Sequence, residues 1–153
     1  IFTGLSGGGL LGGVGLAAKS ASRKVKIFGA SMEKGAAMVE SLKAGKPVQV
    51  PEYESFADSL GGGIGLDNRH TFQLVQQVMD RVFLVSEDNI AKGMTDIFDA
   101  EKFAVEGAAA VGFAAMRQHP LDLRGKKVVF VLSGKNVSSD TFDTALSIGR
   151  HMQ

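Results

Sequence analysis

Short apolar runs alternate along the chain with longer segments in which apolar residues recur every three or four positions. The first pattern is typical of buried strands and the second of helices. Together they predict strands at 1–5, 25–30, Arg81–Val85 and 126–132, and helices at 10–21, 32–44, 68–79, 87–100, 106–118 and after 138. The run at 126–132 is the strongest strand signal. Strands that alternate with helices favour an α/β fold with a mostly parallel twisted sheet and helices on both faces.

Polar residues at the predicted helix starts support this division. Asp67, Ser86 and either Ser138 or Ser139 are positioned to cap helices. Between the helices at 32–44 and 68–79 lies a long connection, 48–65, that contains Pro51 and a second run of glycines. A loop of this length inside a compact domain is usually functional or mobile.

The first fifteen residues predict a binding site. A strand leads into Ser6-Gly7-Gly8-Gly9, and a helix follows from Leu10. A glycine turn exposes consecutive backbone N–H groups, and the helix N-terminus adds partial positive charge. Because glycine has no side chain, an anion can approach the backbone closely. We therefore expect a phosphate group at this turn.

Other interpretations of the same glycines remain open. Gly7, Gly9 and Gly12 fit the dinucleotide pattern G-x-G-x-x-G, and Gly4, Ser6 and Gly8 fit the nucleophile elbow G-x-S-x-G. The turn could also serve only to pack a helix closely against a strand.

The other residues that each of these enzyme motifs requires are not evident in the sequence. A serine nucleophile needs a histidine, and we expect the three histidines of this chain, His70, His119 and His151, at the surface. A ribose-binding acid should close the second strand, where Ser31 stands and Glu33 lies slightly beyond. Gly134-Lys135 lacks the upstream glycine and following Ser or Thr of a P-loop.

Composition narrows the classes of protein. The 153 residues are 44% hydrophobic and 22% charged, as in one globular domain. A net charge of +1 gives no electrostatic case for nucleic acid or an acidic membrane surface, and no apolar run approaches a membrane span. The absence of cysteine excludes disulfides and thiolate chemistry, which fits a cytoplasmic protein. Because the sequence opens directly on a strand without methionine, we expect it to be part of a longer chain.

Four motifs occur in a fixed order: SGGGL (6–10), ADSLGGGIG (57–65), VEGAAAVG (105–112) and VLSGKN (131–136). Taken together, they resemble the C-terminal half of the serine/threonine dehydratases, which are fold-type II pyridoxal-phosphate enzymes of the tryptophan synthase β superfamily. The stretch GASMEKGAAM (29–38) is most similar to the threonine-dehydratase-like proteins of ectoine and hydroxyectoine utilisation. The resemblance implies that 1–153 is the C-terminal part of a large pyridoxal-phosphate domain.

The resemblance also implies roles for particular residues. The residues expected to bind the cofactor are Ser6, Gly7, Gly8, Gly9, Leu10, Glu106 and Ser133. Ser133 would face the pyridine nitrogen, where a neutral hydroxyl makes the ring a weaker electron sink than a carboxylate would. Glu106 would lie near the ring, and Asn136 would hold its own turn. The substrate side would be bordered by Ala57, Asp58 and Ser59.

The implied reaction removes water from a β-hydroxy amino acid of the serine or threonine type and gives a 2-oxo acid and ammonia. A homodimer is the implied assembly. A racemase or a β-replacement synthase on the same scaffold, or a non-catalytic module that binds another phosphate, are the alternatives.

Two departures from the family pattern change the expectation for this chain. The Schiff-base lysine of the family lies in the N-terminal half, and Lys19, Lys24 and Lys135 do not stand in its context. We therefore expect no catalytic residue for that step here, and no activity from this chain alone. Acids of the divalent-cation site in related dehydratases are replaced by Ser31 and Ala37, so we expect no metal.

Overall fold

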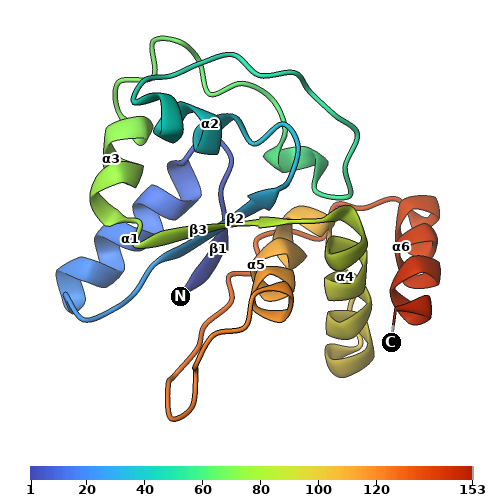
Figure 1. The fold of residues 1–153 in the computed structure, drawn as a ribbon. Helices are drawn as coiled ribbons and strands as arrows, with labels where there is room; N and C mark the ends of the chain where they lie inside the picture. The colour runs from blue at the N-terminus through green and yellow to red at the C-terminus, as the bar shows by residue number, and fades with distance from the viewer. Residues whose placement is uncertain (153) are drawn as a thin grey trace.

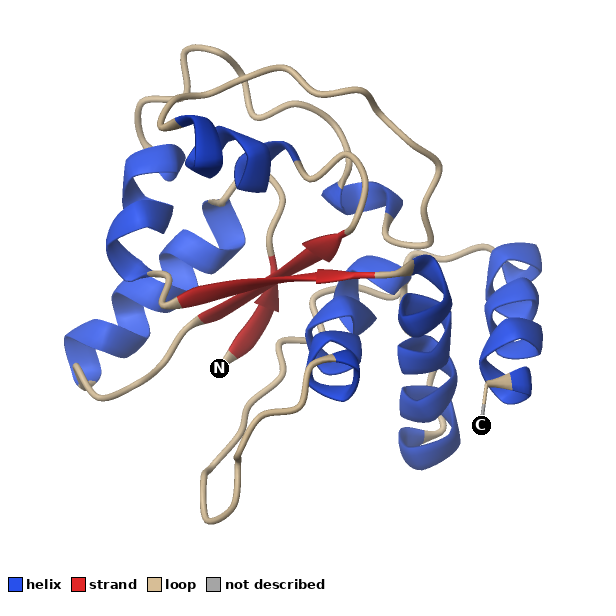
Figure 2. Ribbon diagram, viewed as in Figure 1, coloured by secondary structure: helices blue, strands red, loops and turns tan. Residues whose placement is uncertain are grey.

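The computed structural model describes residues 1–152, which form a three-stranded parallel sheet with helices on both faces (Figures 1 and 2). The strands are β1 (Phe2–Gly4), β2 (Phe28–Met32) and β3 (Arg81–Val85), in that order across the sheet. The helices are α1 (Gly9–Ala21), α2 (Ala37–Ala44), α3 (Thr71–Val78), α4 (Glu87–Glu101), α5 (Gly107–Gln118) and α6 (Ser139–His151), with a 3-10 turn at Asp58–Leu60. The predicted α/β class is confirmed.

Each face of the sheet has its own hydrophobic core. Leu5, Leu11 and Val75 belong to the core beneath α1 and α3, whereas Phe2 and Phe83 belong to the core against α4 and α5. Because successive side chains of a strand point to opposite faces, one short sheet supplies apolar residues to both cores.

The second strand and the helix after it begin later than predicted. β2 is Phe28–Met32 rather than 25–30, and α2 starts at Ala37 rather than at residue 32. Ser31 and Met32 pair with Leu84 and Val85 of β3, so they extend the sheet instead of starting a helix. Gly35, at φ 76°, then turns the chain.

Two of the predicted caps are confirmed and one is wrong. The hydroxyls of Ser86 and Ser138 accept hydrogen bonds from the amides of Asn89 and Thr141, at 3.4 and 3.1 Å. Asp67 is exposed and caps nothing, because α3 begins only at Thr71.

The segment predicted as the strongest strand, 126–132, is not a strand. Phe130 forms a single bridge to Phe2, and the Phe2 amide and carbonyl bond to Val129 and Val131 at 2.8 and 3.0 Å. The segment runs along the edge of β1, and Val129 remains 51% exposed. Its apolar pattern predicted a strand, but within residues 1–152 it pairs only with β1 and only through this bridge.

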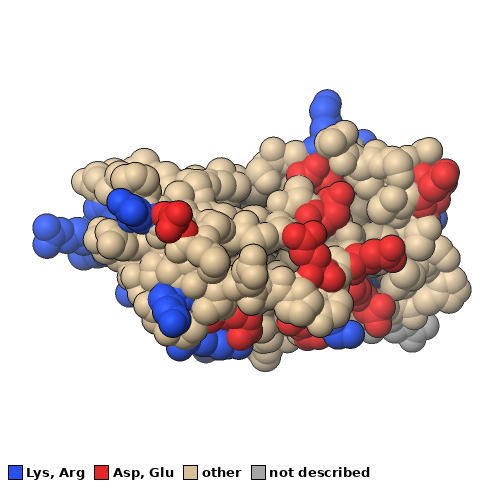
Figure 3. Space-filling model, turned by 90° about the horizontal axis from the view of Figure 1, so that it is seen from above, with Lys and Arg blue, Asp and Glu red and all other residues tan. Residues whose placement is uncertain are grey.

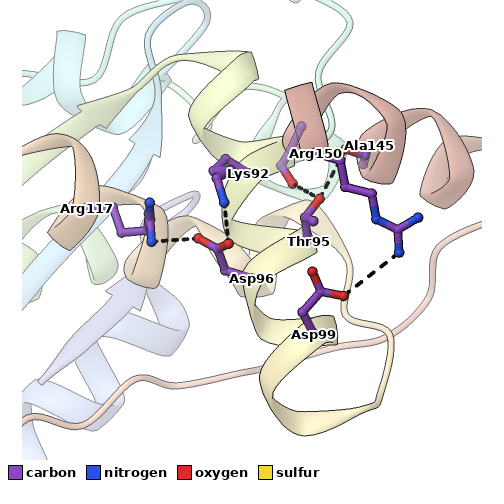
Figure 4. A network of polar contacts seen from close by, with 8 residues as sticks. Lys92, Thr95, Asp96, Asp99, Arg117, Ala145 and Arg150 are labelled. Atoms are coloured by element: carbon purple, nitrogen blue, oxygen red, sulfur yellow. Dashed lines mark hydrogen bonds and ion pairs between the residues drawn. The ribbon is translucent and has the colours of Figure 1, made fainter. Parts of the chain in front are cut away.

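Helices α4 and α6 pack closely against each other, and Figure 4 shows Thr95 of α4 beside Ala145 of α6. The Thr95 hydroxyl lies 2.9 Å from the Ala91 carbonyl and 3.3 Å from the Ala145 carbonyl of α6. A Cβ added at Gly149 would lie 2.1 Å from that hydroxyl oxygen and 3.0 Å from the Ala91 carbonyl. On the other side of α4, Asp96 pairs with both Lys92 and Arg117.

The substitution Gly149→Ala should therefore destabilise the protein, by about 1–3 kcal/mol, because the methyl overpacks this helix crossing. Gly13→Ala is the matched control, since Gly13 is an exposed α1 residue whose Cβ would meet nothing within 4 Å. The control should gain stability by up to about 1 kcal/mol through helix propensity. Urea unfolding measures both, and equal effects of the two substitutions would contradict this account of the α4–α6 contact.

A second polar cluster fastens α1 and α3 to the start of β2. The Asp80 carboxylate forms ion pairs with Lys19 at 2.8 Å and Lys26 at 2.9 Å, and it accepts a hydrogen bond from the Ile27 amide at 2.9 Å. Burial alone would raise the pKa of Asp80, but the hydrogen bonds from Lys19, Ile27 and Lys26 outweigh it and lower the pKa from 3.8 to about 2.

A carboxyl group whose pKa is lower in the folded state stabilises the protein at any pH above its unfolded-state pKa. This stabilisation disappears as the pH falls to the folded-state pKa. Asp80→Asn should thus cost about 1 kcal/mol at pH 7, a figure reduced for solvent screening. The difference from wild type should shrink between about pH 5 and pH 2. Urea midpoints across this range test the prediction, with the exposed Asp67→Asn as control; a pH-independent difference would refute it.

Candidate functional site

A pocket of about 190 Å³ opens at the carboxyl end of β1. Its lining comes from the first eleven residues, the long loop, the start of α5 and the segment before α6: Gly4, Ser6, Gly7, Gly8, Gly9, Leu10, Leu11, Ser59, Leu60, Ala108 and Ser133. The predicted phosphate turn, Ser133 and one residue of the predicted substrate side thus share one cavity. Ligands of open α/β sheets collect at this edge.

The glycine turn presents free amides to this pocket. Gly8, at φ 89°, is the N-cap residue of α1, and no side chain caps the helix. The first turn of α1 holds no acidic residue. A Cβ on Gly7 or Gly9 would meet nothing within 4 Å, so both face open space. The unpaired first-turn N–H groups and the helix dipole together form an anion site.

The turn is supported from behind by α3. A Cβ on Gly8 would lie 2.8 Å from Val75 and 2.9 Å from Met38, so only glycine fits between the turn and these helices. The Thr71 hydroxyl donates a hydrogen bond to the Gly7 carbonyl. This bond fixes the orientation of the peptide that joins Gly7 to Gly8.

Asn68 in turn fixes Thr71. Its side-chain amide nitrogen lies 2.8 Å from the Thr71 hydroxyl and 2.9 Å from the Ile64 carbonyl, and its oxygen accepts the Phe72 amide at 3.0 Å. Sequence reasoning missed Asn68 and Thr71, because nothing local in DNRHT indicates a contact with Gly7.

Glu106 does not line the pocket but holds the turn that carries Ser133. Its carboxylate accepts the Asn136 amide at 3.1 Å, and its own amide donates to the Gly134 carbonyl at 3.3 Å. A Cβ on Gly134 would lie 2.4 Å from the carboxylate. Asn136 is therefore held through its backbone by Glu106.

The three predicted substrate-side residues differ in position. Ser59 lines the pocket, Asp58 is exposed beside it, and Ala57 is fully buried. Ala57 acts as an anchor for the loop, since its carbonyl accepts the Leu60 amide at 2.8 Å.

The histidines do not complete a nucleophile site. His70 and His151 are exposed, but the expectation of a surface position is wrong for His119. Its ring is half-buried, 5.2 Å from the Phe83 ring, and its Nε2 lies 2.8 Å from the Leu84 carbonyl. Within residues 1–152, no histidine lines the pocket that contains Ser6.

Other kinds of site find little support in the described chain. Ser31 and Ala37 are both buried, and residues 1–152 contain no group of three or more acidic, histidine or cysteine side chains arranged to hold a metal. None of the helices in residues 1–152 has the length and apolar character needed to cross a membrane.

Comparison with known proteins explains this arrangement. Residues 1–134 match the family model described as "Pyridoxal-phosphate dependent enzyme". The chain belongs to this family. The resemblance seen in its glycine and VLSGKN motifs is confirmed, and pyridoxal phosphate is the family's cofactor.

Two curated relatives have dehydratase or ammonia-lyase names. A protein of Sinorhizobium fredii named "Putative threonine dehydratase" is 49% identical over 133 residues, which are 87% of this chain and 40% of the relative. The L-threonine ammonia-lyase of Thermotoga maritima is 34% identical over 145 residues, 95% of this chain and 35% of the relative. The chain thus spans well under half the length of these relatives.

Solved structures share the fold. A processed threonine deaminase from Solanum lycopersicum superposes with a TM-score of 0.85 at 26% identity, covering 96% of this chain and 43% of that one. The serine racemase of Dictyostelium discoideum superposes with a TM-score of 0.77 at 31% identity, covering 90% and 43%. These structures confirm the fold class predicted from the sequence.

The support of the glycine turn by Thr71 yields a testable prediction. In the complete protein, Thr71→Val keeps the shape but removes the donor to Gly7, so affinity for inorganic phosphate or pyridoxal phosphate should fall by about tenfold. Thr71→Ser keeps the hydroxyl and should bind almost normally. Equilibrium dialysis measures both, and equal losses for Val and Ser would mean that packing, not the hydrogen bond, matters.

Proposed function

We propose that the complete protein containing this chain is a pyridoxal-phosphate-dependent ammonia-lyase. Its substrate would be a β-hydroxy amino acid of the serine or threonine type, and its products a 2-oxo acid and ammonia. The observation that carries the proposal is the single pocket lined by the glycine turn, Ser133 and Ser59. The dehydratase and ammonia-lyase names of the relatives support the same reaction class.

The residues of the pocket fit the cofactor's chemistry. The amides of Gly7, Gly8, Gly9 and Leu10 would hold the phosphate, and the Ser6 hydroxyl would add a donor. Ser133 would place a neutral hydroxyl at the pyridine nitrogen. Glu106 would keep Ser133 in position through the Gly134 and Asn136 backbone.

When bound, the cofactor supplies an electron sink for the Cα of the amino acid. The part of the reaction assigned to this chain is binding and orientation. The phosphate turn fixes one end of the cofactor, Ser133 sets the electronic character of the ring, and the Ala57–Asp58–Ser59 loop borders the substrate. The Schiff-base lysine would come from a segment outside these residues.

Several finer features belong to the same proposal. The complete enzyme would act as a homodimer in the cytoplasm, and the similarity of 29–38 to ectoine-utilisation proteins suggests a role in ectoine or hydroxyectoine breakdown. Identifying the products formed from the amino acids released in that breakdown would test the last point.

Amino-acid racemisation is the second candidate, because the Dictyostelium serine racemase shares the fold at 31% identity. The two reactions differ in the fate of the β-hydroxyl, which leaves in the lyase and stays in the racemase. Chiral analysis of residual serine, alongside assay of ammonia, separates them. A β-replacement synthase would instead consume O-acetylserine without releasing a 2-oxo acid.

The complete protein, purified with pyridoxal phosphate, should absorb near the edge of the visible range and release ammonia from L-threonine or L-serine. Ser133→Ala should lower kcat by about tenfold or more, because the ring nitrogen loses its hydrogen-bond partner. The exposed Ser147→Ala is the matched control on α6 and should behave as wild type. A folded complete protein without the absorbance band would refute the proposed function.

A further inference from the structure

The loop that carries Ser59 packs between the first turns of two helices. Residues 55–60 lie against the N-terminus of α4 at Glu87 and that of α5 at Gly107. Ser59 and Leu60, at the end of this loop, line the pocket. Whatever fixes residues 55–57 therefore sets the position of that wall.

Glu87 makes two hydrogen bonds to the loop. Its Oε1 accepts the Ser55 hydroxyl at 2.7 Å, and its Oε2 accepts the Phe56 amide at 2.8 Å. The Ser55 oxygen also accepts the Ala57 amide at 3.0 Å, so the contact extends by one residue. Hydrogen bonds to an ionised carboxylate are among the stronger ones in proteins.

Gly107 of α5 contacts the backbone of the same loop. A Cβ at this position would lie 2.2 Å from the Phe56 carbonyl oxygen and 2.9 Å from the Ala57 amide nitrogen. The backbone of α5 thus stands directly against the loop. Glu87 holds the Phe56 amide, the Ser55 hydroxyl holds the Ala57 amide, and Gly107 blocks the Phe56 carbonyl, so residues 56 and 57 have little freedom to move.

The hydrogen bonds from the loop also stabilise the negative charge of Glu87. Glu87 lines a second hollow, of about 280 Å³, in which three carboxylates, those of Glu33, Glu54 and Glu87, share the lining with one cation, Lys34. Figure 3 shows acidic side chains gathered on one part of the face that is seen from above in the view of Figure 1. Like charges in one hollow repel. The α4 N-terminus and the donors of Ser55 and Phe56 offset this repulsion.

We propose that Glu87 is a positioning residue for substrate: through Ser55 and Phe56 it holds the loop whose Ser59 and Leu60 line the pocket, without contacting the ligand. This inference rests on the proposed function. It predicts that Glu87 affects amino-acid affinity and leaves the phosphate end of the site, which is supported by α3, unchanged.

The test compares Glu87→Gln with Asp88→Asn in the complete protein. Asp88 is the exposed neighbour in the same first turn of α4, so both variants remove one charge at the same helix end. In Glu87→Gln, the side-chain amide keeps one acceptor oxygen but replaces the other with an NH2 donor, so it cannot accept from both Phe56 and Ser55. Amide exchange at Phe56 and Ala57 in the cofactor-free protein should become about tenfold faster, and KM for L-threonine should rise about tenfold.

The same experiment separates positioning from general damage. Pyridoxal-phosphate affinity should stay within about twofold of wild type in Glu87→Gln, and Asp88→Asn should match wild type throughout. Ser55→Ala should produce part of the increase in exchange rate and KM, and combining it with Glu87→Gln should add little to either. Ser55→Thr keeps the hydroxyl, so its exchange rate and KM should stay near those of wild type. Unchanged exchange at Phe56, or a parallel loss of cofactor affinity, would overturn the inference.

Failure of the proposed function would look different. A complete protein that neither takes up the cofactor nor releases ammonia would refute the lyase assignment. Amide exchange at Phe56 and Ala57 would still report whether Glu87 holds the loop, because that measurement needs no cofactor.

Discussion

The uncapped start of α1 is the constraint around which the pocket is built. A helix N-terminus leaves several N–H groups without partners, and proteins usually satisfy them with a Ser, Thr, Asp or Asn side chain. Here Gly8 stands at that position and no side chain replaces the missing acceptor. The first-turn amides therefore remain available to an anion.

Open amides are useful only if the turn keeps its shape without a ligand. Thr71 provides this by bonding the Gly7 carbonyl, and Asn68 fixes Thr71 in turn. The tight fit of Gly8 against Val75 and Met38 prevents the turn from sinking toward the core. The glycine turn is thus preorganised by α3 and the residues just before it, which are far from the turn in sequence.

The other walls of the pocket follow the same design. Glu106 and Glu87 both stand at helix N-termini, and each uses its carboxylate to hold the backbone of a loop: Glu106 the turn after Ser133, and Glu87 the segment before Ser59. Neither carboxylate is among the residues that line the pocket. In both cases the helix N-terminus stabilises the negative charge, and the loop that the carboxylate holds carries a serine that lines the pocket.

The sequence by itself determined the order of elements, the parallel α/β class and the glycine turn, because each depends on local patterns. It also singled out Ser133 as a residue of the same site, through the motif VLSGKN. It also determined the family, since four motifs in fixed order are specific where one is not. It could not determine that 126–132 would lie at a sheet edge, because an apolar run reports hydrophobicity and not the number of neighbouring strands. Nor could it show Thr71 against Gly7 or Glu87 against Phe56. Such contacts join residues distant in sequence, and only the packing of α3 and α4 beside the strand ends brings them together.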